Sequence, residues 1–231
     1  MRCTMLSDEK LFKILREDLF TAVVGDILDA EGLTHQFLPP DIKPLRSDMV
    51  LVGRAMPVLE ADYFVDKDIE WKNPLSQKPF GLMFQALDDL KPNEIYLATG
   101  GSGTYAYWGE LMATRAIKLG CTGALINGFS RDTNGVLELN FPTFTKGTYA
   151  QDQGVRGKVV DYRIPVEIAG IRINPGDIIF GDRDGVLVIP QMYEQDVIQK
   201  ALEKVKTENK VKIAIEQGMS AVEAFEKFGV F

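Results

Sequence analysis

The spacing of the apolar residues changes part-way through the segment 109–132. In the first half, apolar side chains recur every three or four positions, which predicts a helix over 109–119 that ends at Gly120. The next apolar residues are continuous over 123–126 and predict a short buried strand. Gly128 then predicts a loop over 128–130. The segment is therefore expected to form a helix, a strand and a loop.

Charged residues stand at the free ends of this predicted helix and strand. Glu110 begins the helix, and Arg131 and Asp132 follow the loop. Because a helix followed by a strand folds back on itself, we expect Glu110 to lie close to Arg131 and Asp132. Helix-start N–H groups, a guanidinium and two carboxylates would then converge. This combination suits a carboxylate-bearing substrate and a hard metal ion.

Outside this segment, the chain alternates helices and strands before it becomes rich in strands. The pattern predicts helices over 8–20, 23–30, 80–90, 193–217 and 221–228. It predicts strands over 50–59, 95–98, 141–144, 158–163, 166–173, 177–180 and 186–189. This order of elements is typical of a layered α/β fold.

Residues 60–80 interrupt the pattern, because they are more polar and contain two prolines and Trp71. We interpret them as an insertion or a surface excursion. A solvated loop anchored by Trp71 is the simpler interpretation, and a role in substrate choice or in a subunit contact is the alternative.

Composition narrows the class of protein. The 231 residues are 45% hydrophobic and 26% charged, which are ordinary globular values. A net charge of −7 argues against a nucleic-acid-binding surface. Two cysteines, Cys3 and Cys121, make a disulfide framework improbable. No apolar run approaches the ~18 residues of a membrane span, and the first residues do not resemble a signal peptide. We therefore expect a soluble, cytoplasmic protein without a membrane partner.

A glycine-rich loop offers a competing interpretation. Gly101, Gly103 and Ala106 match a relaxed dinucleotide-binding fingerprint. However, the following strand ends in Asn127, where an acidic residue would be required for the ribose. A flexible turn that lines the acid site is the favoured interpretation.

Three other kinds of residue are weaker candidates for a functional role. His35 is the only histidine, so a catalytic triad or a histidine-rich zinc site would depend on it alone. Cys121 is expected to pack in the interior, because a nucleophile would need a nearby base. The aromatic residues Tyr105, Tyr107 and Trp108 either form a pocket wall or pack beside the helix.

Glu110, twenty further residues and then Arg131-Asp132 resemble the signature of the 4-hydroxy-4-methyl-2-oxoglutarate aldolases. This family also includes the regulator of ribonuclease activity A. Further stretches resemble the family in the same order: TAVVGDILD at 21–29, GRAMPV at 53–58, PGD at 175–177 and GDRDGVLVIP at 181–190. The similarity extends over about 21–231 and departs from the family around 60–80.

The resemblance implies an architecture. It implies an α/β, layered β/β/α swivelling-domain-like fold with N-terminal and C-terminal helices. A single RraA-like domain would cover 1–231, with a polar insertion at about 60–80. The family's assembly implies a homo-oligomer, a trimer or a hexamer, with active sites between subunits.

The resemblance also implies roles for individual residues. Gly109, Glu110, Leu111, Met112 and Arg131 would bind a small 2-oxo acid. Asp132 would bind Mg²⁺ or Mn²⁺ directly, and Glu110 would bind it through a water. Glu208 of a neighbouring subunit is the best match for a further metal-site glutamate, with Glu203 as the alternative. Asn127 stands where the family often has Asp, which removes a carboxylate there.

The implied function is that of a metal-dependent, class II aldolase. Such an enzyme would cleave a 4-hydroxy-2-oxo acid, either of the 4-hydroxy-4-methyl-2-oxoglutarate type or derived from a sugar, to pyruvate. The metal and Arg131 would stabilise an enolate, so oxaloacetate decarboxylation is the expected side activity. The alternative is a non-catalytic regulator that binds a ribonuclease or another protein. The presence of Glu110, Arg131 and Asp132 together favours catalysis.

Overall fold

The computed structural model describes residues 6–63, 72 and 74–230, and these form two compact units. One unit is His35–Gln191, and the other combines the residues up to Thr34 with those from Met192 onward. Cys3 and Trp71, singled out in the sequence, lie outside the described residues. Within the described part of the chain, none of the helices has the length and apolar content that a membrane crossing requires.

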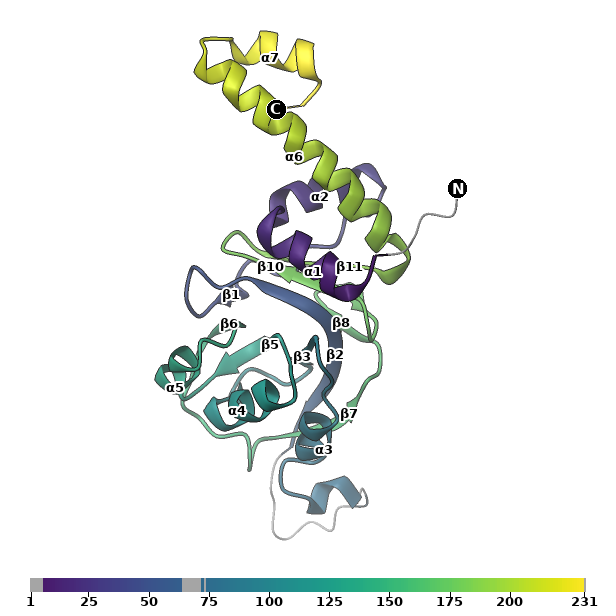
Figure 1. Ribbon diagram of the computed structural model, residues 1–231. Helices are drawn as coiled ribbons and strands as arrows, with labels where there is room; N and C mark the ends of the chain where they lie inside the picture. Colours follow the sequence, from purple (N-terminus) through teal and green to yellow (C-terminus); the bar gives the residue numbers. More distant parts are fainter. Residues whose placement is uncertain (1–5, 64–71, 73, 231) are drawn as a thin grey trace. The chain divides into compact units, whose positions relative to one another are not determined.

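A mixed sheet organises the unit His35–Gln191 (Figure 1). Its strands run in the order β1 (Lys43–Pro44), β6 (Thr143–Thr148), β5 (Gly123–Ser130), β3 (Glu94–Thr99), β2 (Leu51–Asp62), β10 (Ile178–Gly181) and β11 (Val186–Ile189). In addition, β4 (Ala106–Trp108) pairs with β5, and β7 (Gly157–Tyr162) pairs with β2. The pairs β2–β3, β3–β5 and β5–β6 are parallel, whereas β10 and β7 are antiparallel to β2.

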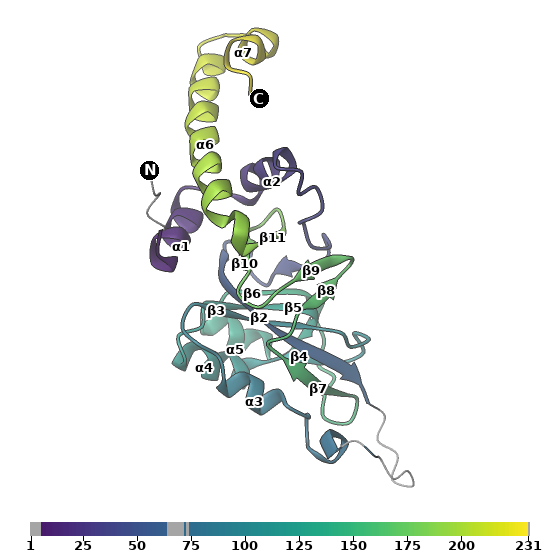
Figure 2. The same ribbon diagram turned by 90° about the vertical axis from the view of Figure 1, so that its right-hand side faces the viewer.

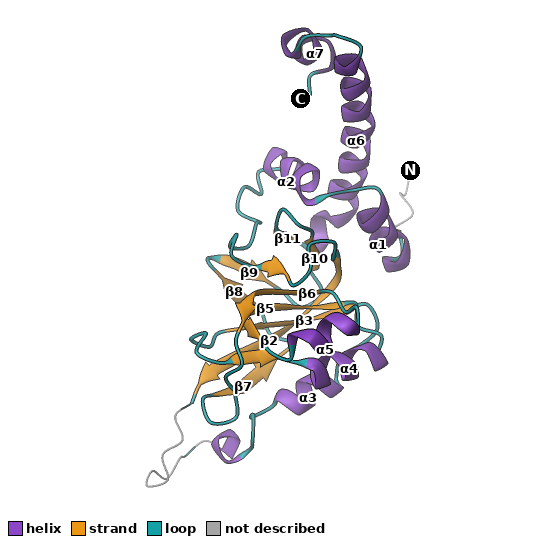
Figure 3. Ribbon diagram, turned by 90° about the vertical axis from the view of Figure 1, so that its left-hand side faces the viewer, coloured by secondary structure: helices purple, strands orange, loops and turns teal. Residues whose placement is uncertain are grey.

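Both faces of the central strands are buried, which explains their continuous apolar runs. In β3, Tyr96 and Ala98 belong to one hydrophobic cluster, and Ile95 and Leu97 belong to the other. The first cluster packs beneath α3 (Met83–Asp88), α4 (Glu110–Lys118) and α5 (Thr133–Glu138), which gather on one side of the sheet in Figure 3. The second cluster includes the hairpin of β8 (Val166–Ile168) and β9 (Ile171–Ile173). A helix layer, the main sheet and this small second sheet make up the β/β/α layering.

Two sequence predictions in this unit were wrong, and one helix was missed. The loop over 128–130 is the end of β5, because Phe129 and Ser130 pair with β6. Gly128 is needed there for close packing, since an added Cβ would lie 2.6 Å from the ring of Tyr107. The predicted strand 166–173 is a hairpin whose turn residues, Ala169 and Gly170, have positive φ. Finally, the short helix α5 was not predicted.

The short strands β1 and β4 were also not predicted, and the other predicted elements differ from the observed ones only at their ends. The strand predicted over 50–59 continues to Asp62 as β2, and the helix predicted over 80–90 is shortened to α3. Phe80 and Gly81 both have positive φ, which is incompatible with an α-helix at these positions. A 3-10 turn at Pro74–Gln77 precedes them.

The second unit consists of helices: α1 (Asp8–Glu17), α2 (Thr21–Ala30), α6 (Glu194–Glu216) and α7 (Ala221–Phe228), with a 3-10 turn at Gln191–Tyr193 beside it. Figure 2 shows α6 as the long helix, and a short turn connects it to α7. Lys200 and Lys204 of α6 form ion pairs with Glu31 and Asp26. Ser220 and Glu223 form a capping box at the start of α7.

Candidate active site

The start of α4 and the end of β5 lie side by side. β4 pairs with the last residues of β5 and leads directly into α4, and Trp108 O accepts a hydrogen bond of 2.9 Å from Arg131 N. Gly109, the N-cap of α4, offers no side chain to cap the helix. The first-turn N–H groups therefore point from an uncapped, electropositive helix start toward the region of Arg131.

Two glycines allow the predicted carboxylates to approach the neighbouring elements. A Cβ added to Gly109 would lie 2.8 Å from Asp132 Oδ2, so Asp132 rests against the backbone of the α4 N-cap. A Cβ added to Gly135 would lie 2.2 Å from Glu110 Oε2, so the Glu110 carboxylate rests on the first turn of α5. The structure thus brings the ends that carry Glu110, Arg131 and Asp132 together, as the sequence predicted.

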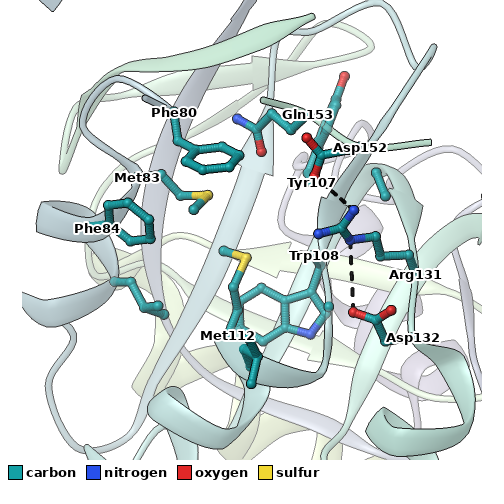
Figure 4. A pocket seen from close by; sticks show the side chains of 14 residues that line it. Phe80, Met83, Phe84, Tyr107, Trp108, Met112, Arg131, Asp132, Asp152 and Gln153 are labelled. Carbon is teal, nitrogen blue, oxygen red and sulfur yellow. Dashed lines mark ion pairs between the residues drawn. The ribbon is translucent and has the colours of Figure 1, made fainter. Parts of the chain in front are cut away.

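Arg131 and Asp132 differ in their surroundings. Asp132 is the N-cap of α5 and adopts the left-handed conformation, with φ of 53° and ψ of 39°. Its Oδ2 lies 3.8 Å from Arg131 Nε. Arg131 Nη1 lies closer to Asp152 Oδ1, at 2.8 Å (Figure 4). Asp152 is therefore the main ionic partner of Arg131, and Asp132 has no comparably short ion pair among the described residues.

A cavity of about 360 Å³ opens beside these residues (Figure 4). Of the predicted site residues, Gly109, Leu111, Met112, Arg131 and Asp132 line it. Glu110 is not among the described lining residues, because its carboxylate turns toward α5. The rest of the lining is formed by Phe80, Met83, Phe84, Leu87, Ala106, Tyr107, Trp108, Asp152 and Gln153.

A buried carboxyl group lies behind the cavity wall. Glu60 is 1% exposed, and its Oε2 accepts a hydrogen bond of 2.7 Å from Gln153 Nε2. Its Oε1 has no hydrogen-bond partner among the described residues. Burial raises the pKa of Glu60 to about 8, so the carboxyl is protonated at neutral pH. Glu60 thereby holds the amide of a residue that lines the cavity.

Sequence reasoning missed Glu60, Asp152 and Gln153. Glu60 was assigned to the polar segment 60–80, yet it follows Met56 and Val58 at a spacing of two on the face of β2 that packs under the helices. This spacing of two is the sequence pattern that indicates an inward-facing Glu60 side chain. Asp152 and Gln153 lie in an irregular segment before β7, and no local pattern marks them.

The donor set at the cavity fits a hard divalent cation held by few protein ligands. The described residues contain no cluster of three His, Cys, Asp or Glu side chains suited to a metal ion. Asp132 remains as a half-exposed carboxylate at the cavity, since Asp152 is engaged by Arg131. Mg²⁺ is commonly held by one or two carboxylates, with waters and substrate oxygens completing the shell.

Comparisons with known proteins identify the family of the chain. The family model described as "RraA-like: Aldolase/RraA" matches residues 21–188. The chain belongs to the RraA-like family. A relative from Halalkalibacterium halodurans, named "Putative 4-hydroxy-4-methyl-2-oxoglutarate aldolase", is 30% identical over 208 residues and shares 89% of each chain. Protein DlpA of Legionella pneumophila is 31% identical over 90% of this chain, which spans 32% of that relative's length.

Solved structures of similar proteins confirm the predicted fold class. An uncharacterized protein from Pseudomonas syringae has a TM-score of 0.82 and 26% identity, with 99% of this chain and 98% of that chain covered. RraAS2 of Streptomyces coelicolor, described as an unusual member of the RNase ES inhibitor RraA protein family, has a TM-score of 0.75 at 19% identity and covers 91% and 99% of the two chains. The latter likeness concerns the fold alone.

In this RraA-like chain, the glycine-rich loop does not have the surroundings of a dinucleotide site. Ala106 begins strand β4 rather than a helix, so the helix start that binds a pyrophosphate does not follow the loop. A Cβ on Gly101 would lie 2.4 and 2.5 Å from the hydroxyls of Tyr107 and Tyr105. The absence of a side chain at Gly101 therefore allows the two tyrosine hydroxyls to pack against its backbone.

The remaining candidates are not among the described residues that line the cavity. His35 is exposed, and its Nε2 lies 3.3 Å from Ala169 O. Cys121 is buried, and burial raises the pKa of its thiol to about 12, as expected of a packing residue. Glu208 belongs to the helical unit, where it pairs with Lys204 at 3.7 Å. Its role at a neighbouring subunit's site stays a prediction.

Proposed function

We propose that the protein is a divalent-metal-dependent aldolase that cleaves a 4-hydroxy-2-oxo acid and releases pyruvate. The observation that carries the proposal is the meeting of Arg131, Asp132 and the uncapped start of α4 at one cavity. Membership of a family whose model names aldolases supports the reaction class.

Different residues of the chain would bind the carboxylate and the 2-oxo group of the substrate. Backbone N–H groups of Leu111 and Met112 would receive the substrate carboxylate at the positive end of α4. Arg131 would face the 2-oxo oxygen, and Asp152 would hold the guanidinium in that orientation. When the C3–C4 bond breaks, its electron pair moves toward that oxygen, and the fixed positive charge of Arg131 stabilises the resulting enolate.

Asp132 would hold the Mg²⁺ or Mn²⁺ ion, and Glu110 would hold one of its waters. When bound, the ion supplies Lewis-acid polarisation of the 2-oxo group. Loss of the 4-hydroxyl proton to a water turns C4 into a carbonyl, and protonation at C3 completes pyruvate. Decarboxylation of oxaloacetate passes through the same enolate, so it is the expected side activity.

The proposed assembly is a homotrimer or a dimer of trimers with active sites between subunits. Glu208 of one subunit would then complete the site of its neighbour. Light scattering during size-exclusion chromatography tests the assembly. Replacement of Glu208 by Gln should lower the metal affinity of the assembled protein, and an unchanged affinity would remove Glu208 from the site.

Pyruvate release from oxaloacetate and from 4-hydroxy-4-methyl-2-oxoglutarate tests the function. We expect release with Mg²⁺ or Mn²⁺, loss with EDTA, and loss in Asp132→Ala at any metal concentration. Arg131→Ala should reduce turnover by about 100-fold or more even with saturating metal, because the enolate charge loses its fixed partner. Full activity of either variant contradicts the assignment. No release from the folded wild-type protein would favour the regulator hypothesis and a search for a bound ribonuclease.

A further inference from the structure

The cavity has one charged wall and one apolar wall. The apolar wall is defined here as Phe80, Met83, Phe84, Leu111 and Met112. Figure 4 shows Phe80, Met83 and Phe84 across the cavity from Arg131 and Asp132. A substrate whose carboxylate end lies at the charged wall therefore extends its other end toward the apolar wall.

The apolar wall exposes large side chains that a ligand would cover. Phe84 is 52% exposed and Leu111 is 83% exposed. Covering apolar surface gains about 25 cal/mol per Å², and concave sites concentrate this gain on the bound ligand. An apolar substituent would use this surface, whereas a polyol chain would lose hydration against it.

The charges of the cavity argue against a second substrate carboxylate. Arg131 is the only cationic side chain among the described lining residues, and Asp152 already neutralises part of its charge. The other two charged residues of the lining, Asp132 and Asp152, are both acidic. A carboxylate placed at the apolar wall would find no cationic side chain there among the described lining residues of this chain, and burying an unpaired charge is costly.

The apolar wall is held in a defined position. Phe80 has a φ of 57°, which is uncommon for a bulky residue and places it at the turn before α3. This turn is attached to β7, because Val159 N donates to Phe80 O at 3.2 Å and Leu82 N donates to Val159 O at 2.9 Å. Phe80 also meets Phe84 edge to face, at 5.6 Å between ring centroids. These contacts fix the position of Phe80 in the apolar wall.

We propose that the physiological substrate is a 4-hydroxy-2-oxo acid with an apolar aryl or branched alkyl group on C4. This inference rests on the proposed function and names the substrate class of the same site. The C3–C4 bond breaks and its electrons pass to the pyruvate enolate. The C4 hydroxyl gives up its proton and becomes the carbonyl of an apolar aldehyde or ketone, and C3 takes up a proton. No oxidant or reductant is needed.

Three substrates separate this proposal from its alternatives. They are 4-hydroxy-2-oxo-4-phenylbutanoate, 4-hydroxy-4-methyl-2-oxoglutarate and a 2-oxo acid with a polyol chain, each assayed for pyruvate with Mg²⁺. We expect kcat/KM for the phenyl compound to exceed the other two by about 10-fold or more. Oxaloacetate decarboxylation is measured in parallel, because it tests the proposed function without using the apolar wall.

A charge placed on the apolar wall should invert the preference. Phe84→Arg introduces a cation, so the ratio of kcat/KM for the phenyl compound to that for the dicarboxylate should fall by about 100-fold. Phe37→Arg is the matched control, since Phe37 belongs to the same unit, is 44% exposed and is not among the described lining residues. It should leave the ratio unchanged. Thermal unfolding confirms that both variants fold.

Each outcome decides one question. Decarboxylation of oxaloacetate together with a preference for the dicarboxylate or the polyol overturns the substrate class and leaves the aldolase intact. Absence of pyruvate from all substrates overturns both proposals. A Phe84→Arg protein with an altered oligomeric state and an unaltered substrate ratio would assign Phe84 to a subunit contact and overturn the inference.

Discussion

Arg131 Nη1 lies 2.8 Å from Asp152 Oδ1, although α5 and β6 separate the two residues along the chain. The pair joins the end of β5 to the segment before β7, and both residues line the cavity. Because the guanidinium is planar, a partner on one side determines which edge it presents to a ligand. Asp152 is therefore inferred to be a positioning residue for Arg131.

The first prediction concerns this pair. Asp152→Asn should lower kcat for oxaloacetate decarboxylation by about 10-fold, because a misplaced catalytic group loses rate without losing its charge. Asp88→Asn is a matched control, since Asp88 forms an ion pair of the same 2.8 Å length with Arg115, and neither residue is among the described lining residues. Steady-state kinetics of both variants checks the expectation. Equal effects of the two substitutions on kcat would contradict a positioning role of Asp152.

The second prediction concerns Gly109. A Cβ there would lie 2.8 Å from Asp132 Oδ2, so Gly109→Ala should displace Asp132 and weaken Mg²⁺ binding by about 10-fold or more. The backbone at Gly109 is extended, with a φ of −163°, so alanine adds no conformational strain. In Gly185→Ala, the new Cβ would lie at an ordinary 3.5 Å from Phe37. Titration calorimetry with Mg²⁺ should distinguish the two proteins, and identical affinities would contradict the contact.

The third prediction concerns Glu60 and pH. The folded-state pKa is about 8, above the ordinary value of 4.5, so the folded protein binds a proton that the unfolded chain releases. The stabilising contribution of this proton is complete below pH 4.5 and is lost as the pH rises toward 8. Glu60→Gln removes the dependence while keeping an oxygen for Gln153.

Urea unfolding between pH 5 and pH 8 measures this difference. The variant should gain stability relative to the wild type by roughly 2–4 kcal/mol across that range. A difference between the two proteins that does not change with pH would mean that Glu60 is not protonated in the folded state.

The fourth prediction concerns Arg163, which follows β7. Its guanidinium forms ion pairs with Glu94 at 2.6 Å and with Asp89, and it donates to Asp89 O at 2.7 Å. Arg163→Ala should destabilise the protein by about 2–3 kcal/mol, because several charge-assisted hydrogen bonds are lost and Glu94 is left poorly solvated. The exposed pair of Arg115 offers a control that should cost less than about 1 kcal/mol. The denaturant midpoints of the Arg163→Ala and Arg115→Ala variants measure the two losses of stability.

The sequence predicted the central part of the site because that part is local. The helix that begins at Glu110 and the strand that precedes Arg131 have strong apolar patterns, and a helix–strand unit brings its ends together. The loop predicted at Gly128 was wrong, because glycine occurs both in turns and where a neighbouring side chain packs closely against the backbone. Here the ring of Tyr107 requires it.

The other half of the cavity depends on contacts between distant segments. Phe80 belongs to a strained turn, and Gln153 belongs to an irregular segment held by Glu60. No periodic pattern identifies such residues, since their positions follow from the pairing of β2 with β7. Glu60 was the exception, because its alternation with Met56 and Val58 indicated an inward-facing side chain.

The contacts of Gly109 and Gly135 have a consequence for descent within the family. Each glycine leaves room for one carboxylate, Asp132 in the first case and Glu110 in the second. A lineage that loses a carboxylate no longer needs the matching glycine, and a lineage that replaces the glycine displaces its carboxylate. The two positions of each pair should therefore vary together among homologues. Retention of both glycines would then identify the family members that keep both carboxylates, whatever function their names give.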